Sequence, residues 1–349
     1  MARSVANRDI VVIGASTGGI GALRVLVRDL PEDLPAAIFV VMHVGATSHL
    51  AAILDRGSTL PVVKAENGAA IEHGRIHVAV PGKHLLLHDN HILLRRGARE
   101  NHARPAIDPL FRSAAASFGG RVIGVVLSGA LSDGTAGLRA IKRCNGLAVV
   151  QDQEDADMPE MPQSALQHVE VDHVVPMHAM GALLGKLTRQ EAAPTPEIPL
   201  DIRLEAAIAA QELAGMKMDD MLGEPSRFTC PECHGTLWEI EDGSLLRYRC
   251  HVGHAFSADA VQSAQGEEVD RLLGTLLRAQ QERAGLARRM AEYERQSGRT
   301  SLADQLARRA AEYDDGAQLL RSLMRNGEAN GEVLTKAQQQ GVSKDEQEA

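Results

Sequence analysis

Short apolar runs alternate with amphipathic segments along the first 190 residues of the chain. Ile10–Ile13 and Ile38–Val44 are apolar runs rich in β-branched residues, as in buried strands, and Ile20–Leu30 between them has apolar residues at helical spacing. Strands that alternate with helices in this way form mainly parallel sheets with both faces covered. The pattern therefore predicts an α/β fold with a mainly parallel, doubly wound sheet. The same alternation predicts later strands at 122–127, 147–151 and 173–176 and later helices at 109–118, 138–143 and 163–168.

Residues 75–95 break this alternation. Arg75–Val80 and His84–Arg95 read as antiparallel strands, because two apolar stretches flank Asp89 and Asn90, residue types that favour tight hairpin turns. We therefore expect an antiparallel hairpin beside the parallel sheet.

The pattern changes after Ala192–Glu197, whose sequence AAPTPE is typical of a linker. Leu204–Leu213 is rich in alanine and predicts a helix, and a cluster of cysteines and histidines follows it. The predicted domain boundaries are 1–190 for the α/β domain, 191–225 for a linker with a helix, 226–257 for a small cysteine-containing module, 258–327 for a helical region and 328–349 for a tail.

The C-terminal part of the chain is predicted to be helical over residues 258–327 and unstructured over residues 328–349. Leu272, Leu276, Leu286 and Met290 recur at helical spacing, and Gly298 interrupts the pattern before a second such segment. This arrangement predicts an α-helical hairpin that packs or self-associates through its apolar residues. The final residues are rich in Gln, Glu and Gly, a composition that predicts disorder.

Composition and charge exclude several classes of function. The 349 residues carry a net charge of −9, so we expect no nucleic-acid partner held by a basic face. The longest uninterrupted apolar run, Ala36–Met42, is far shorter than the ~20 residues that span a bilayer, and no signal-peptide core follows the N-terminus. We therefore expect a cytoplasmic protein without membrane insertion.

A serine follows the first predicted strand in a tight, glycine-rich turn. Gly14-Ala15-Ser16-Thr17-Gly18 has the G-x-S-x-G spacing, in which small neighbours leave a serine hydroxyl free to attack a carbonyl. Similar turns also hold phosphates and dinucleotides. A dinucleotide site, however, needs glycine where Ser16 stands and an acidic residue at the end of Ile38–Val44, and the chain has neither.

Two further residues with matching chemistry follow other predicted strands. His43 ends the strand after Ser16, and Asp133 follows the strand at 122–127. The carboxyl ends of parallel strands share one edge of a sheet, so the three side chains are expected to gather there. A serine nucleophile needs a histidine to accept its proton and a carboxylate to orient that histidine. Taken singly, His43 could be a structural histidine and Asp133 could belong to an ordinary Asp-Gly turn. Together with Ser16, the two residues predict a catalytic triad.

Several motifs resemble one family of enzymes. The string GASTGG at 14–19, His43, Arg104-Pro105-x-x-Asp108, the string S-G-x-x-x-D-G-x-x-G-L from Ser128, and Glu160-Met161-Pro162 occur in the order found in the catalytic domain of CheB-type protein-glutamate methylesterases. The resemblance covers residues 9–187.

The resemblance implies a function and a set of site residues. Ser16 would be the nucleophile, His43 the general base and Asp133 its orienting carboxylate, with Thr17 and Gly18 at the oxyanion site. The implied reaction is hydrolysis of glutamyl methyl esters on methyl-accepting chemotaxis receptors or similar methylated proteins, with glutamine deamidation as a companion activity.

The chain departs from the family in two places. Ala130 stands where the family has a methionine beside the nucleophile, so the acyl pocket is expected to differ in shape. Only nine residues precede Ile10, where the first predicted strand begins, so we expect no N-terminal receiver domain. The alternative function is a non-catalytic adaptor that has a degenerate methylesterase domain and acts through its C-terminal modules.

The cysteine cluster has the spacing of a zinc site. Cys230, Cys233, Cys250 and His254 form C-x2-C-x16-C-x3-H, and three thiolates with one imidazole complete a tetrahedral zinc shell without an open position. A redox Cys pair is the alternative, but it leaves Cys250 and His254 without a role. We expect structural zinc in a ribbon-like module that contacts other proteins, and no cofactor for catalysis. We also expect chelation to unfold this module and leave the ester chemistry intact.

Overall fold

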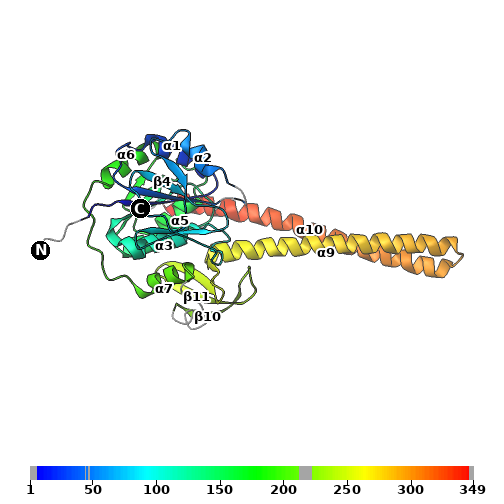
Figure 1. The fold of residues 1–349 in the computed structure, drawn as a ribbon. Coiled ribbons are helices and arrows are strands. Elements are labelled where there is room, and N and C mark those ends of the chain that lie inside the picture. The colour runs from blue at the N-terminus through cyan, green and yellow to red at the C-terminus, as the bar shows by residue number, and fades with distance from the viewer. Residues whose placement is uncertain (1–5, 44, 46–47, 212–221, 346–349) are drawn as a thin grey trace. The chain divides into compact units, whose positions relative to one another are not determined.

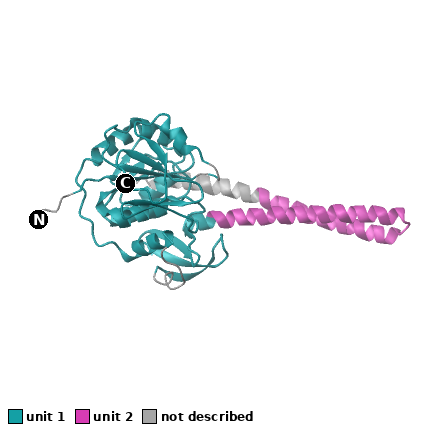
Figure 2. Cartoon of the chain, in the orientation of Figure 1, with its two compact units in different colours: residues 1–262 teal, residues 263–349 magenta. Residues whose placement is uncertain are grey.

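The computed structural model describes residues 6–43, 45, 48–211 and 222–345. Its contacts divide the chain into two compact units, Met1–Gln262 and Ser263–Ala349 (Figure 2). The first unit therefore contains the α/β domain, the predicted linker and the cysteine-containing module together. The division into separate domains at 190 and 226 stays a prediction.

A seven-stranded parallel sheet forms the centre of the first unit (Figure 1). Its strand order is β3-β4-β2-β1-β7-β8-β9, so β1 lies in the middle between β2 and β7. The chain order reverses between β1 and β7, which is where such sheets place their functional sites. The strands are β1 Ile10–Ala15, β2 Ala37–Met42, β3 Val62–Lys64, β4 Arg75–Val78, β7 Val122–Val126, β8 Leu147–Gln151 and β9 His173–Val175.

Helices cover both faces of this sheet, and each face has its own core. Alternate β1 side chains enter the two cores: Val11 and Ile13 pack on one side, and Ile10 and Val12 on the other. The predicted mainly parallel, doubly wound fold is confirmed. The helices on the first face are α1 Gly19–Asp29, α2 Leu50–Asp55 and α6 Met177–Leu187, and those on the second are α3 Ile107–Phe118, α4 Thr135–Arg143 and α5 Glu160–His168, with the short 3-10 turn η1 Gly119–Arg121 after α3.

The predicted hairpin is confirmed in part. β5 (His84–His88) and β6 (His91–Arg95) pair antiparallel, and Asp89 and Asn90 both have positive φ, as a two-residue hairpin turn requires. The prediction of an antiparallel strand at 75–80 is wrong. β4 pairs parallel with β2 and β3, and its buried residues Ile76 and Val78 pack in the same core as Val11 and Ile13.

A second sheet lies in the C-terminal part of the first unit. Its four antiparallel strands have the order β10-β11-β12-β13 and form the cysteine-containing module. Helix α7 (Leu200–Ala209) precedes it, where the sequence predicts a helix at 204–213; residues 212 and 213 of that prediction lie outside the described residues. The strands are β10 Glu224–Thr229, β11 Thr236–Asp242, β12 Leu245–Cys250 and β13 Ala255–Ser257.

The second unit consists of most of one long helix and a second helix antiparallel to it, which confirms the predicted hairpin. α9 spans Ala258–Gln296, α10 spans Thr300–Asp345, and Gly298 with φ +78° lies in the turn between them. Ion pairs such as Arg288–Asp314 join the two helices. Among the described residues, no helix combines the length and the hydropathy that crossing a bilayer requires.

Two predictions for this unit differ from the structure. The buried seam holds small residues, such as Ala284, Ala287 and Ala291, whereas Leu286 and Met290 are exposed. The backbone of α10 is helical to Asp345, where the sequence predicts a disordered tail from residue 328. Ala, Lys, Gln and Glu are good helix formers, so a polar composition does not by itself prevent a helix.

Candidate active site

The structure brings Ser16, His43 and Asp133 together at the carboxyl edge of the parallel sheet. Ser16 directly follows β1, His43 directly follows β2, and Asp133 lies on the loop between β7 and α4. Because β2, β1 and β7 are adjacent in the sheet, their ends present these three residues side by side.

The turn that carries Ser16 is held from two sides. The Ser16 N–H donates to the carbonyl of Ser128 at 2.9 Å, and the Ser128 hydroxyl donates to the carbonyl of Thr17 at 2.9 Å. Gly18 has φ +77°, and a Cβ at this position would lie 2.6 Å from the Ser128 hydroxyl oxygen, so only glycine fits. No side chain caps α1, and its first N–H, that of Gly19, donates to the Ser16 carbonyl at 2.9 Å.

A continuous chain of hydrogen bonds joins the three predicted residues. Ser16 Oγ lies 3.0 Å from His43 Nδ1, and His43 Nε2 lies 2.7 Å from Asp133 Oδ2. A carboxylate can only accept, so Nε2 carries the imidazole proton and Nδ1 accepts the Ser16 hydroxyl proton. Asp133 is 2% exposed, whereas the His43 side chain keeps 24% exposure, which leaves the ring open to an incoming substrate.

Backbone and side-chain donors hold Asp133 in this position. The N–H groups of Ile107 and Asp108, at the start of α3, donate to its two carboxylate oxygens at 2.7 and 3.2 Å. Asn101 Nδ2 donates to Asp133 Oδ1 at 3.0 Å. The α3 N-terminus reaches this far because Ile107 packs on Gly14 of β1, where a Cβ would lie 2.4 Å from Ile107 Cγ2.

Two buried carboxyl groups share the site, and their environments differ. Burial opposes ionisation of Asp133, but the hydrogen bond and charge of His43, with donors from Ile107 and Asn101, outweigh it and lower the pKa of Asp133. Burial and the neighbouring Asp133 charge raise the pKa of Asp108 to about 8. Asp133 is therefore the member of the pair that carries negative charge, as a partner of a protonated histidine must.

Met161 forms a wall beside Ser16. Its sulfur lies so close to Gly129 that a Cβ on this glycine would be 2.0 Å from Sδ and 2.8 Å from Ser16 Cβ. Ala130 is half-buried on the same loop, and the side chain of Glu160 accepts the neighbouring Leu131 N–H at 2.7 Å. Neither Met161 nor Asn101 was predicted as a site residue. The sequence did contain a signal for Met161, because it belongs to the Glu160-Met161-Pro162 motif that resembles the family.

The four predicted metal ligands also meet. The sulfur atoms of Cys230, Cys233 and Cys250 and a ring nitrogen of His254 all lie within 4.8 Å of one another. Cys233 Sγ and Cys250 Sγ are 3.6 Å apart, and His254 Nδ1 is 3.5 Å from Cys250 Sγ. Zinc–sulfur bonds of ~2.3 Å in a tetrahedron separate two sulfurs by roughly 3.8 Å, so the donor set fits one ion.

Comparisons with known proteins identify relatives of the first half of this chain. The sequence profile of the CheB methylesterase family matches residues 11–184. A relative from Leptospira interrogans is 38% identical over 184 residues, which cover 52% of this chain and 95% of the relative. A relative from Anaeromyxobacter dehalogenans, named protein-glutamate methylesterase/protein-glutamine glutaminase 2, is 39% identical over 186 residues, which cover 53% of this chain and 54% of the relative.

A solved structure shows the same fold. The crystal structure of the Thermotoga maritima CheB methylesterase catalytic domain matches with a TM-score of 0.50 and 33% identity, and the match covers 52% of this chain and all of that domain. The first half of the chain thus has the architecture of an α/β ester hydrolase of the chemotaxis type. The chain belongs to the CheB methylesterase family.

Proposed function

We propose that this protein is a protein-glutamate methylesterase that hydrolyses glutamyl methyl esters on chemoreceptors by a Ser–His–Asp mechanism. The hydrogen-bond chain from Ser16 through His43 to Asp133 is the observation that carries the proposal. It also argues against a degenerate adaptor, since an adaptor has no need to keep three side chains in this order.

The first half of the proposed reaction forms an acyl-enzyme. Ser16 Oγ attacks the ester carbonyl while His43 Nδ1 accepts the hydroxyl proton, and the buried Asp133 carboxylate stabilises the resulting imidazolium. The Thr17 N–H, with Gly18 beside it, would donate to the oxyanion at the start of α1. His43 then returns the proton to the leaving oxygen, and methanol departs.

The second half regenerates the serine. Water gives a proton to His43 and attacks the acyl carbon, and the bond to Ser16 Oγ breaks as the serine takes the proton back. The products are a glutamate carboxylate and free enzyme. With a glutamine side chain the same steps release ammonia in place of methanol, so we propose glutamine deamidation as a second activity.

Methanol release from a glutamyl γ-methyl ester tests the proposal. We expect Ser16→Ala and His43→Ala each to lower kcat by at least about 10³-fold with the fold intact, and the double variant to be scarcely worse, because triad members act as a unit. Ser117→Ala is the matched control, since its exposed hydroxyl donates only to the Leu87 carbonyl. Wild-type turnover by Ser16→Ala would refute the assignment.

We further propose that the Cys/His cluster holds one structural zinc ion. The mutual distances of the four donors support a closed tetrahedral shell, in which no position is left for water or substrate. Cys230, Cys233, Cys250 and His254 would be the ligands, and the ion would supply stability rather than chemistry.

Metal analysis tests this second proposal. We expect about one equivalent of zinc per chain, lost in Cys230→Ser and in Cys250→Ser. Cys144→Ala is the matched control, because Cys144 lies buried in the α/β core away from the cluster and should leave the metal content unchanged. Protein purified without chelators that contains no zinc would overturn the assignment.

The remaining predictions concern partners and location. We propose a methylated chemoreceptor as the protein substrate and therefore a cytoplasmic site of action, with no nucleic-acid partner. We propose self-association through the helical hairpin, supported by exposed apolar residues such as Leu286, Met290 and Tyr293.

A further inference from the structure

Strand β13 joins the cysteine-containing module directly to the loop that supports Asp133. It begins one residue after His254 and pairs with β12 on one side. On its other side, Ala255 donates its N–H to the Arg99 carbonyl at 3.3 Å and accepts the Asn101 N–H at 2.8 Å. The backbone of residues 99–101 therefore extends the small sheet as a further, short partner of β13.

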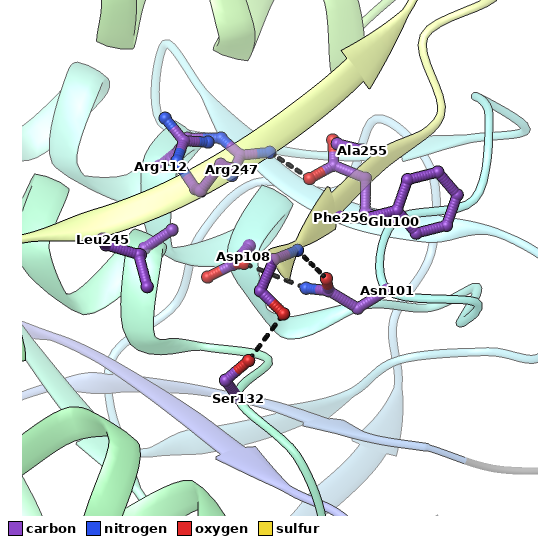
Figure 3. A pocket seen from close by; sticks show the side chains of 11 residues that line it. Glu100, Asn101, Asp108, Arg112, Ser132, Leu245, Arg247, Ala255 and Phe256 are labelled. Carbon is purple, nitrogen blue, oxygen red and sulfur yellow. Dashed lines mark hydrogen bonds and ion pairs between the residues drawn. The ribbon is translucent and has the colours of Figure 1, made fainter. Parts of the chain in front are cut away.

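Asn101 carries this connection to the triad. The backbone N–H of Ser257 in β13 donates to Asn101 Oδ1 at 3.0 Å. Because an N–H must meet the amide oxygen, the amide nitrogen points the opposite way, where it donates to Asp133 Oδ1 at 3.0 Å and Asp108 Oδ2 at 3.2 Å. In Figure 3, dashed lines join the Asn101 side chain to Asp108 and to the end of the strand that carries Ala255 and Phe256.

A second contact reaches the residue next to Asp133. The Ser132 hydroxyl donates to Ser257 Oγ at 2.7 Å, and Ser257 Oγ also accepts the N–H of Ala260 in the first turn of α9 at 3.2 Å. Ser132 and Ser257 are 3% and 6% exposed, so water does not compete for these bonds. β13 thus contacts both the residue before Asp133 and its amide donor.

Buried charges hold the module in this position. Arg249 of β12 pairs with Glu100 at 3.2 Å and with Glu205 of α7 at 2.8 Å. Arg112 of α3 pairs with Glu100 from the other side. These groups are almost fully buried. The cavity of ≈ 10 Å³ that Glu100 and Arg112 line has room for about one water molecule and no larger ligand. The contact is therefore built for support rather than for binding a ligand.

The metal ligands lie at the base of β13. Cys250 ends β12, His254 precedes β13, and the turn between them is closed by hydrogen bonds from the Cys250 N–H to the His254 carbonyl at 2.9 Å and from the Gly253 N–H to the Cys250 carbonyl at 2.7 Å. An ion bound by both residues would fix this turn and with it the start of β13.

We propose that the cysteine-containing module is a positioning device for the catalytic aspartate, in which the metal-bound turn sets β13, β13 orients Asn101, and Asn101 orients Asp133. Asn101 is then a positioning residue, and the module is part of the support of the active site. The inference rests on the proposed Ser–His–Asp mechanism. It replaces the expectation from sequence that chelation leaves ester chemistry intact.

Asn101→Gly tests the last link with the metal in place. Asn101 has φ +48°, a conformation that glycine adopts freely, so the variant removes the amide and keeps the backbone. We expect kcat on a small glutamyl methyl ester to fall about 10- to 100-fold with KM changed by less than about 3-fold. The acid limb of the pH profile of kcat/KM should shift to higher pH, because the pKa of Asp133 rises when the carboxylate loses a hydrogen-bond donor.

Asn90→Gly is the matched control for this variant. Asn90 also has positive φ, at +64°, but lies exposed in the β5–β6 turn. It should leave kcat, KM and the pH profile unchanged. If Asn101→Gly behaves in the same way, the link from Asn101 to Asp133 carries no function and the inference is wrong.

Zinc removal tests the first link in the full-length protein. We expect chelation to lower the wild-type kcat by a factor similar to that of Asn101→Gly, and added Zn²⁺ to restore it. In Asn101→Gly, chelation should cause little further loss, because both changes break one chain of contacts. Unchanged wild-type kcat after chelation, or an equal further loss in the variant, would overturn the inference.

The Ser16→Ala variant separates failure of this inference from failure of the proposed function. If Ser16→Ala hydrolyses the ester as well as wild type, the mechanism itself is wrong. If Ser16→Ala is inactive and chelation leaves the wild-type kcat unchanged, the mechanism stands and only the role of the module is wrong.

Discussion

At the scale of single residues, the site depends on glycines that make room for their neighbours. Gly129 faces both Met161 and Ser16 at distances that no Cβ can share. Met161 is fully buried, so its side chain cannot move out into solvent and must repack among its neighbours. The close approach of Met161 to Ser16 therefore requires a residue without a side chain at position 129.

We predict that Gly129→Ala lowers kcat by about 10-fold or more and destabilises the protein by about 1–3 kcal/mol, the usual range for an overpacked core. The new methyl group would push against Met161 Sδ at 2.0 Å and Ser16 Cβ at 2.8 Å. A second change, Met161→Ala, should restore part of the stability by relieving the closer contact. Kinetics on a small methyl ester and urea unfolding measure both effects.

Gly21→Ala is the matched control in the neighbouring helix. A Cβ at Gly21 would meet no atom within 4 Å, so the alanine should stabilise α1 by up to about 1 kcal/mol and leave kcat unchanged. If Gly129→Ala has the same kcat as Gly21→Ala, the packing of Met161 against Gly129 does not shape the site beside Ser16, and this prediction is wrong.

At the scale of elements, a buried ion cluster joins α3, α7 and β12. Glu205 of α7 binds Arg247 and Arg249 of β12 at 2.7 and 2.8 Å. Burial would raise the pKa of Glu205, but the charges of Arg112, Arg247 and Arg249 outweigh it and hold the pKa well below its usual value of 4.5. Arg112 and Arg249 lower the pKa of the buried Glu100 against the same effect of burial.

This cluster predicts a loss of stability in acid. A carboxyl group whose pKa is lowered by folding stabilises the native state above its unfolded pKa, and the stabilisation disappears as the pH falls through the folded value. We therefore expect the contribution of the cluster to be constant at neutral pH and to be lost progressively below pH 4.5. Thermal unfolding from pH 7 to pH 3 measures it.

Glu205→Gln isolates the effect. It leaves three buried arginines without one counter-charge, so we expect a loss of about 3–5 kcal/mol at pH 7 and a shallower decline of stability in acid than in wild type. Glu72→Gln is the control, because its ion pair with Arg75 is exposed and should contribute less than about 1 kcal/mol. Parallel acid curves for wild type and Glu205→Gln would rule out this account.

At the scale of the whole molecule, the boundary between the two compact units lies after Gln262, and the predicted linker lies within the first unit. We expect a chain truncated after residue 262 to fold, to keep its metal and to retain kcat on a small ester within about 3-fold.

A chain truncated after residue 190 loses Glu205, Arg247 and Arg249 together with β13. We expect its kcat to fall at least about 10-fold, since Arg112 and Glu100 lose partners and Asn101 loses its donor.

These truncations are compared by kinetics and by metal content. Equal kcat for both truncated chains would show that the module does not support catalysis. The matched stretch of this chain covers nearly the full length of the Leptospira relative, so the family fold itself does not need the module. The dependence predicted here belongs to the residues of this chain.

The sequence by itself determined the α/β fold and the candidate chemistry. Alternating apolar runs predicted the strands, and the order of parallel strand ends predicted that Ser16, His43 and Asp133 would meet. The spacing of Cys230, Cys233, Cys250 and His254 predicted their cluster. These features are local in origin: each rests on periodicity, turn chemistry or ligand spacing within a short segment, and a parallel sheet brings strand ends together without further information.

Only the tertiary structure decided how the modules support one another. The proposed role of Asn101 depends on Ser257, 156 residues away along the chain, and the charge of Asp133 depends on which carboxyl of a buried pair keeps its proton. The alanine seam of the hairpin likewise depends on how closely two helices approach. Such contacts join segments distant in sequence, and their energies come from burial and from charge, neither of which a periodic pattern contains.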